Sequence, residues 1–261
     1  MKINNWCRKL SSVLVAGGLL LPSAAQAADL NTNLVVNGDF ENVNLAVTGE
    51  YNGPLVLGWT GPNLFAYSHN GSASSAGVVP DYADGLVDPP GAGDWYFTPN
   101  NTGQVGDPPV PAFTAVHDPG VYYQDIDVST GTTAIAIAAG SATYSLSAFM
   151  SSYLNDDDYG NVLVEFNSAA NVLLGSGTIN DAADSGDNNV WNLTSTTGSV
   201  PVGTTSIRMS LFGTKIGGAA TGGADGYTDN IDFRITGIPE PTSVLLAGLG
   251  LGAAGLLRRK R

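Results

Sequence analysis

Few side chains in this sequence could carry out acid–base or nucleophilic chemistry. The histidines are His69 and His117, and the one cysteine is Cys7. The chain has no G-x-S-x-G elbow, no H-E-x-x-H zinc motif and no glycine-rich phosphate loop. His117 and Asp118 are sequence neighbours, which would point to opposite faces of a strand and could not form a relay. With 23 acidic residues a glycosidase-like carboxylate pair is conceivable, but no spacing marks one. We therefore expect a protein that is not an enzyme.

Aromatic side chains are the better candidates for binding chemistry, because sugar rings stack on exposed aromatic faces. Tyr82, Trp95 and Tyr96 lie within residues 77–120, a stretch that holds eight of the 14 prolines. This stretch has too few apolar residues for a core of its own, so we expect a long insertion loop. Long loops often carry function, which makes these three residues the candidate ligand-binding set. Packing inside the protein is the alternative interpretation of the same residues.

The charge distribution excludes one class of partner. The net charge is −13, and residues 28–238 contain 22 acidic but only three basic residues, Arg208, Lys215 and Arg234. A phosphate backbone requires a basic surface, so nucleic-acid binding is excluded. An acidic exported domain that binds divalent metal fits the same composition.

The N-terminal segment predicts export. Residues 1–9 are cationic, Leu10–Leu21 are apolar or small, and Ala25-Gln26-Ala27 matches the A-x-A site of signal peptidase. We expect residues 1–27 to be a signal helix that is removed after Ala27. Cys7 would leave with it, so the mature chain would have no disulfide and no thiolate site.

The C-terminal segment has three parts in order: Pro239-Glu240-Pro241, the uncharged run Thr242–Leu257, and the basic end Arg258–Arg261. A helix of 16 residues spans about 24 Å, slightly less than the roughly 30 Å hydrocarbon core. The basic end would stay in the cytoplasm and place the main domain outside. We therefore predict a hydrophobic, marginally membrane-spanning helix at residues 242–257.

These three parts resemble the PEP-CTERM sorting signal of Gram-negative bacteria that make exopolysaccharide. The resemblance covers residues 238–261. It implies that an exosortase recognises Pro239, Glu240 and Pro241, cuts near them, and moves the protein from the inner membrane toward the cell surface or extracellular matrix. A permanent single-pass anchor is the alternative.

The body, residues 28–237, shows short alternating runs between Gly, Asn, Asp and Pro clusters and no sustained helical period. About ten such strands predict two packed antiparallel sheets, an all-β sandwich. The expected strands are 33–40, 55–60, 64–68, 121–128, 143–150, 161–166, 171–176, 190–197, 206–211 and 227–236, with one further strand at Trp95–Thr98.

The order of signals in the body also resembles jelly-roll carbohydrate-binding modules and the galactose-binding-like fold. The matching pieces are Asn37-Gly38-Asp39-Phe40-Glu41, Gly58-Trp59, Tyr123–Val128 and Asp229-Asn230-Ile231. In such jelly rolls, acids of the first and last strands bind a structural Ca²⁺, so the resemblance implies a calcium site at Glu41 and Asp229. From the residues themselves, strand parity turns Asp229 inward, whereas Glu41 would need a bulge.

Two functions follow from these observations. The first is a non-enzymatic surface or matrix protein that is exported, held briefly in the inner membrane and then processed. The alternative is a calcium-stabilised, lectin-like module that binds exopolysaccharide.

Overall fold

A computed structural model describes the body of the chain in residues 28–48, 54–61, 66–69, 73–74, 77–78, 88–98, 121–152, 158–182, 190–214 and 226–237. The predicted signal helix, the sorting motif and the predicted helix at 242–257 lie outside these ranges. Within them, no helix is long and apolar enough to cross a membrane.

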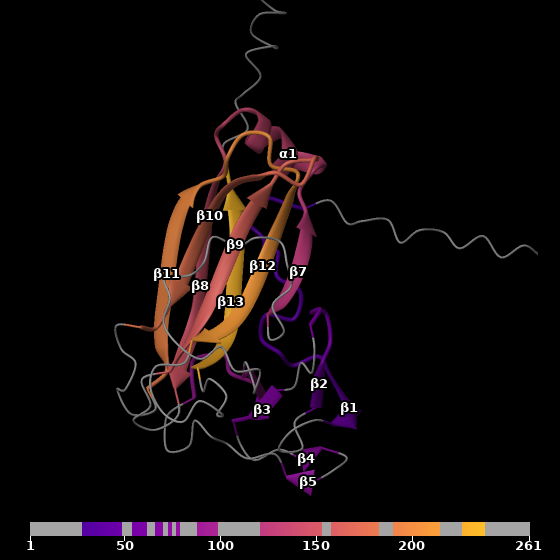
Figure 1. Ribbon diagram of the computed structural model, residues 1–261, viewed down its shortest axis with the longest axis vertical. Helices are drawn as coiled ribbons and strands as arrows, with labels where there is room; N and C mark the ends of the chain where they lie inside the picture. Colours follow the sequence, from indigo (N-terminus) through magenta and orange to yellow (C-terminus); the bar gives the residue numbers. More distant parts are fainter. Residues whose placement is uncertain are drawn as a thin grey trace, which may run out of the picture.

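The described part is an antiparallel jelly-roll β-sandwich, as the sequence predicted (Figure 1). One sheet has the order β10-β9-β12-β7 and the other β11-β8-β13-β6-β3. The four strands of the first sheet are β7 (Tyr122–Asp127), β9 (Tyr159–Asn167), β10 (Leu173–Asn180) and β12 (Ser206–Thr214). The five of the second are β3 (Ala66–Ser68), β6 (Trp95–Phe97), β8 (Thr143–Ser152), β11 (Asn192–Ser199) and β13 (Gly226–Thr236).

The remaining elements lie at the two ends of the sandwich (Figure 1). One end carries the single described helix, α1 (Gly131–Ala138). The opposite end carries two small hairpins, which are β1 (Val43–Thr48) paired with β2 (Pro54–Val56) and β4 (Ala73–Ser74) paired with β5 (Gly77–Val78). The long strands therefore run between an end that carries a helix and an end that carries two hairpins.

Alternation along the strands builds the core between the sheets. On β8, Tyr144, Leu146 and Met150 are buried while Ser145 and Ser147 are only half-buried. On β12, Ile207 is fully buried and aligned with Ile126 of β7 and Phe166 of β9. A period-two pattern of this kind is the expected signature of a sheet with one covered face.

Two expectations about secondary structure were wrong. Residues 33–40 form turns and no strand, and Asn37 and Phe40 have φ angles of 52° and 55°, which an extended strand does not allow. The helix α1 was not expected, because eight residues are too few to establish a helical period and Ala134-Ile135-Ala136-Ile137 alternates like a strand.

The strand expected at Trp95–Thr98 is β6, and it is an internal strand of the second sheet. It pairs with β13 through Thr228 and Phe97 and with β3 through Tyr67 and Tyr96. This part of the proline-rich stretch is therefore built into the sandwich. The domain boundaries at 27, 77–120 and 238 stay predictions.

Candidate functional site

A buried histidine joins β3 to β13 inside the second sheet. The His69 ring Nε2 lies 3.1 Å from Asp229 Oδ2, and both side chains have no exposed surface. On the other side of the ring, Nδ1 lies 3.2 Å from Asp88 Oδ1, close enough for an ion pair, and the Asp88 side chain is 42% exposed. The imidazole therefore has a carboxylate oxygen beside each nitrogen.

Aromatic rings enclose this histidine. Its centroid lies 4.7 Å from that of Tyr96 and 5.2 Å from that of Trp191, and Tyr96 in turn packs 5.2 Å from Tyr227. The backbone N–H of His69 donates to the Asp94 carbonyl at 3.0 Å. The polar pair is thus held in a mostly apolar setting, where charge interactions are stronger than in water.

Burial dominates the electrostatics of Asp229. It raises the pKa of this carboxyl from 3.8 to about 6, against the opposing effects of the His69 hydrogen bond and of the Asn230 N–H bond at 2.7 Å. The negative charge of Glu41 raises the pKa slightly further. Asp229 is buried, but the parity argument for its direction was wrong, because a register shift between Asp229 and Asp232 marks a bulge at Asn230, whose φ is 51°. Asp229 is paired with Phe149 and Phe233 with Leu146, so these two side chains of β13 point to opposite faces of the sheet.

Glu41 lies close to β6. Its Oε1 accepts the backbone N–H of Trp95 at 2.8 Å. Its carboxyl group also lies directly against the α-carbon of Gly93, where an added Cβ would collide with it. Glycine at this position therefore makes room for the Glu41 side chain.

The predicted calcium pair does not fit a metal site as these groups are arranged. Both oxygens of Asp229 accept hydrogen bonds, from His69 and from the Asn230 N–H, and one oxygen of Glu41 is taken by Trp95. Calcium prefers six to eight oxygen ligands. No group of three or more His, Cys, Asp or Glu side chains suited to a metal occurs among the described residues. Calcium binding stays a prediction.

Trp95 and Tyr96 are packing residues in the structure. They are 5% and 0% exposed, and Tyr96 packs edge-on against Tyr67 across the pair of strands β3 and β6. As successive residues of β6 they point to opposite faces of the sheet, and each ring is covered on its own face, so neither is open to a sugar in this arrangement. Tyr82, the third predicted ligand residue, lies outside the described residues, as do Pro239, Glu240 and Pro241 of the sorting motif.

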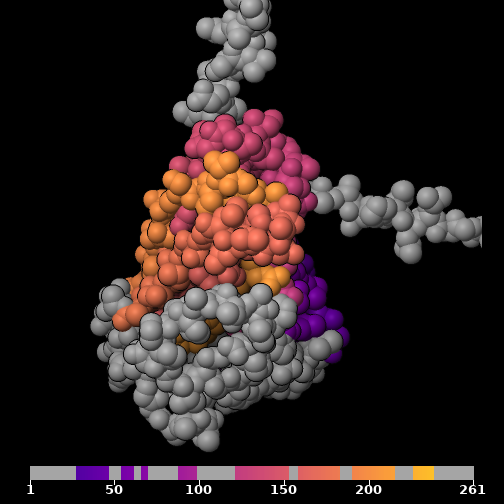
Figure 2. Space-filling model, turned by 45° about the horizontal axis from the view of Figure 1, so that its top comes forward, coloured from indigo at the N-terminus to yellow at the C-terminus, as the bar shows by residue number. Residues whose placement is uncertain are grey.

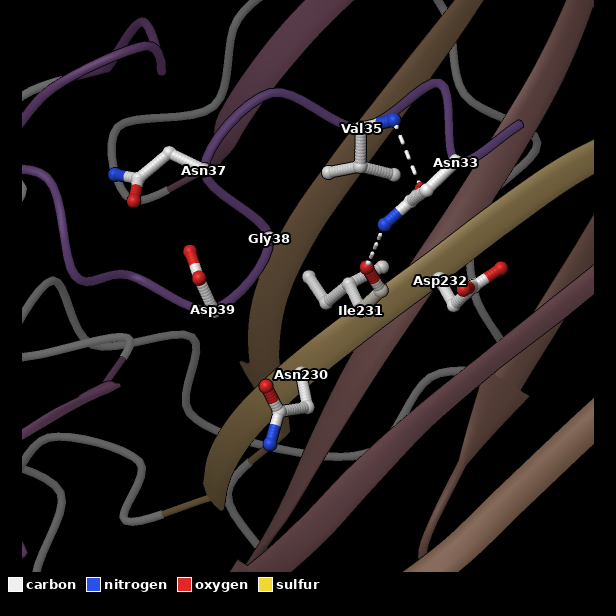
Figure 3. Close-up of a pocket in the computed structure, with 8 residues that line it drawn as sticks. All are labelled: Asn33, Val35, Asn37, Gly38, Asp39, Asn230, Ile231 and Asp232. Atoms are coloured by element: carbon white, nitrogen blue, oxygen red, sulfur yellow. Dashed lines mark hydrogen bonds between the residues drawn. The ribbon is translucent and has the colours of Figure 1, made fainter. Parts of the chain in front are cut away.

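A separate polar pocket of about 370 Å³ lies between the first segment of the body and β13 (Figure 3). Amides and carboxylates dominate its lining, which is made by Asn33, Val35, Asn37, Gly38, Asp39, Asn230, Ile231 and Asp232. In Figure 3 the side chains of Asp39 and Asn230 extend on the same side of the close approach between Gly38 and Ile231. The backbone there is tight, since the Ile231 N–H donates to the Gly38 carbonyl at 2.9 Å.

The side chains of this pocket divide into structural and exposed ones. The Asn33 side chain is structural: its Nδ2 donates to the Ile231 carbonyl, and its Oδ1 accepts the N–H groups of Val35 and Phe233, each at 3.0 Å. Asp232 is bound by Arg234. Asp39 is exposed, with its carboxylate at the pocket mouth. The 37–41 and 229–231 segments stand out in the sequence, but only the fold brings them face to face across a pocket.

His69 was also missed as a structural centre. The sequence showed it as an isolated histidine, and its two carboxylate neighbours lie 19 and 160 positions away along the chain. The partners of a lone histidine cannot be found from the sequence unless the register of β3, β6 and β13 is known.

The order of the strands in the two sheets places the body among antiparallel jelly-roll β-sandwich proteins. Residues 237–261 match the family described as the PEP-CTERM protein-sorting motif, so the chain carries that motif at its C-terminus. No curated protein matches the chain.

The solved structures that resemble this chain include β-rich proteins that are larger than it and one that is smaller. A CBM4 structure is 16% identical, covers 77% of this chain and 99% of its own, and gives a TM-score of 0.35. The enzymatically active domain of bacteriophage CBA120 tailspike protein 4 is 11% identical at a TM-score of 0.38, and an arabinose-bound GH51 α-L-arabinofuranosidase is 14% identical at 0.37. They cover 78% and 79% of this chain, which spans only 21% and 27% of theirs. These likenesses carry no argument about function.

Proposed function

We propose that this protein is a non-enzymatic, exported surface or extracellular-matrix protein that an exosortase processes at Pro239-Glu240-Pro241. The observation that carries the proposal is the PEP-CTERM sorting motif at 237–261, which begins as the last strand β13 ends at Thr236. The sorting signal therefore follows the folded sandwich directly, with no further domain between them.

The described chemistry supports a binding or structural role. His69 is enclosed by aromatic rings and engaged with Asp229, so it has no surface on which to meet a substrate. General acid–base catalysis requires a group within hydrogen-bond reach of the substrate. The acidic surface would keep the released domain soluble.

Processing of the tail in the native host tests this proposal. We expect the intact mass of the secreted protein to correspond to a chain that starts at Ala28 and ends near Pro239-Glu240-Pro241. Glu240→Ala should retain the protein in the inner membrane, whereas the matched Glu50→Ala, 190 positions earlier in the sequence, should be released normally. Full-length protein in the membrane of a host with an active exosortase would show a permanent anchor instead.

Carbohydrate binding is the second candidate, and the pocket in Figure 3 favours it. Its volume of about 370 Å³ lies in the usual range for small-ligand pockets, and amides with carboxylates are suitable partners for sugar hydroxyls. A glycan array with the wild type, Asp39→Ala and the outlying exposed Asp29→Ala tests this function. Binding by the wild type and Asp29→Ala, but not by Asp39→Ala, would support the pocket. Absence of binding by all three would discard the lectin-like role.

The predicted role of calcium is tested separately. If calcium stabilises the fold, chelation should lower the melting temperature of the wild type, because a ligand that binds only the folded state stabilises it. Glu41→Gln should then be insensitive to chelation. An unchanged transition of the wild type would discard the calcium site.

A further inference from the structure

Both ends of the folded body lie against α1. The Ala28 carbonyl accepts a hydrogen bond from Thr133 Oγ1 at 2.7 Å, although 105 residues separate them. At the other end of the chain, Gly237 lies so close to Ala136 that an added Cβ would come within 2.8 Å of its methyl group. The predicted signal peptide and the sorting motif therefore join the sandwich at the same end.

This end of the sandwich is apolar on its outside. Five of the exposed large apolar residues belong to α1, the β9–β10 turn with the start of β10, and the β11–β12 turn, and we call them the apolar tip: Ile135, Val172, Leu173, Leu174 and Val202. Ile135 and Val202 are 61% and 62% exposed. The turns touch one another, because Gly203 lies beside Leu174 and Gly140 beside Val202. In Figure 2 the magenta, coral and orange segments meet at this end.

The segments that form this end are also without charge. Residues 128–142, 166–180 and 188–207 contain no Asp, Glu, Lys or Arg, in a chain of net charge −13. Two exposed carboxylates lie at its margin: Asp127 directly precedes residues 128–142, and Asp29 follows Ala28, whose carbonyl contacts α1. Membranes with anionic lipids repel acidic surfaces, so this is the end of the sandwich that can approach one closely.

The length of the connecting chain fixes how far this end can be from the sorting helix. Four residues lie between Gly237 and Thr242, where the predicted membrane segment begins. Even fully extended, the five steps from Gly237 to Thr242 span at most about 18 Å. The headgroup layer takes up about 5–7 Å of that distance. The tail therefore holds the α1 end beside the membrane surface.

We propose that the apolar tip rests in the lipid headgroup region of the outer face of the inner membrane while the C-terminal segment anchors the chain. This interaction rests on the proposed export and anchoring. It orients the sandwich, with the β1–β2 and β4–β5 hairpins directed away from the bilayer (Figure 1). Aliphatic side chains bind an interface in proportion to the apolar area that they bury, and release of the tail would then free the tip.

Spin labels on the full chain test the proposal. The chain is taken in a Cys7→Ser background and reconstituted into vesicles of phosphatidylethanolamine and phosphatidylglycerol. Single cysteines replace Val202 or Leu173 in the tip, or Leu45 on β1 as the matched exposed control. We expect the Val202 and Leu173 labels to collide several-fold more with oxygen, relative to an aqueous nickel chelate, than the Leu45 label.

The outcomes separate this proposal from the anchoring on which it depends. Vesicle flotation reports anchoring alone. Protein that floats while its tip labels are as accessible to the nickel chelate as Leu45 would overturn the membrane-bound tip and leave anchoring intact. Protein that does not float would overturn both. Protection of the tip labels that rises with protein concentration in the absence of lipid would assign the tip to a second copy of the chain, and would also overturn the proposal.

Discussion

His69 Nε2 and Asp229 Oδ2 lie 3.1 Å apart with no exposed side-chain surface on either residue. Through this contact β3, from the N-terminal part of the body, is fixed to the last strand. A buried charged pair gives little net stability, but removal of one partner leaves the other unpaired at a cost of about 3–5 kcal/mol. The first prediction concerns the ionisation of this pair.

Asp229→Asn should change the pH dependence of stability. The pKa of Asp229 is 3.8 when exposed and about 6 when folded, so between these values the unfolded chain binds fewer protons than the native one. Stability contributed by this carboxyl is therefore full below pH 3.8 and is lost as the pH rises to about 6. The unfolding free energy of the wild type, relative to Asp229→Asn, should fall by about 3 kcal/mol over this range. Urea unfolding at several pH values measures it, and parallel curves would contradict the raised pKa.

Gly93→Ala should destabilise the protein through Glu41. The new methyl group would occupy the place of the Glu41 carboxyl and break its bond to the Trp95 N–H. An unsatisfied buried donor costs about 1–3 kcal/mol, and Glu41→Ala should cost a similar amount. Glu41→Gln keeps an acceptor oxygen and serves as the control, with a smaller loss. Equal losses for Glu41→Gln and Glu41→Ala in thermal melts would mean that the hydrogen bond is not what matters.

Gly198→Ala should show that Tyr144 requires glycine beside it. A Cβ at Gly198 would lie 2.7 Å from the Tyr144 ring, and one at Gly177 would meet its hydroxyl. Overpacking of this kind costs about 1–3 kcal/mol. In the double variant with Tyr144→Leu the losses should be less than additive by at least about 0.5 kcal/mol. Ser195→Ala, exposed on the same strand, is the control. Strictly additive losses would refute the contact.

Arg208→Met should cost more than Arg234→Met, although each arginine binds an aspartate. Arg208 binds Asp125 through two bonds of 2.8 Å, and it also stands opposite Glu165, whose pKa burial raises and Arg208 lowers. Without Arg208, Glu165 becomes a buried carboxylate that has lost its facing cation. The exposed pair of Arg234 with Asp232 contributes little to stability, because solvent screens it.

The cost of Arg208→Met should also depend on pH. A raised folded pKa means that the stability from Glu165 is lost as the pH rises and regained as it falls below the exposed value of 4.5. The difference in stability between the wild type and Arg208→Met should therefore be smaller at pH 4 than at pH 7. Denaturant unfolding of both arginine variants at the two pH values measures this. Equal costs for Arg208→Met and Arg234→Met at pH 7 would contradict the role given to Glu165.

The sequence by itself determined the sandwich and the C-terminal motif. Alternation in segments such as Ser206–Thr214 reflects the two faces of a pleated strand, and that pattern is local. The motif at 237–261 is likewise a linear signal that needs no folding to be recognised.

Only the tertiary structure decided which residues meet. The first segment, 33–40, has the composition of a strand. The Asn33 side chain, however, forms hydrogen bonds with backbone groups of β13, and these bonds replace those of a regular β-ladder. Trp95 and Tyr96 were expected on a short strand within an insertion loop, as ligand contacts, and pairing of β6 between β13 and β3 buries them. His69 meets Asp229 across 160 positions. Such contacts depend on strand order and register, which the sum of many weak packing interactions selects, and no local stretch of sequence contains that information.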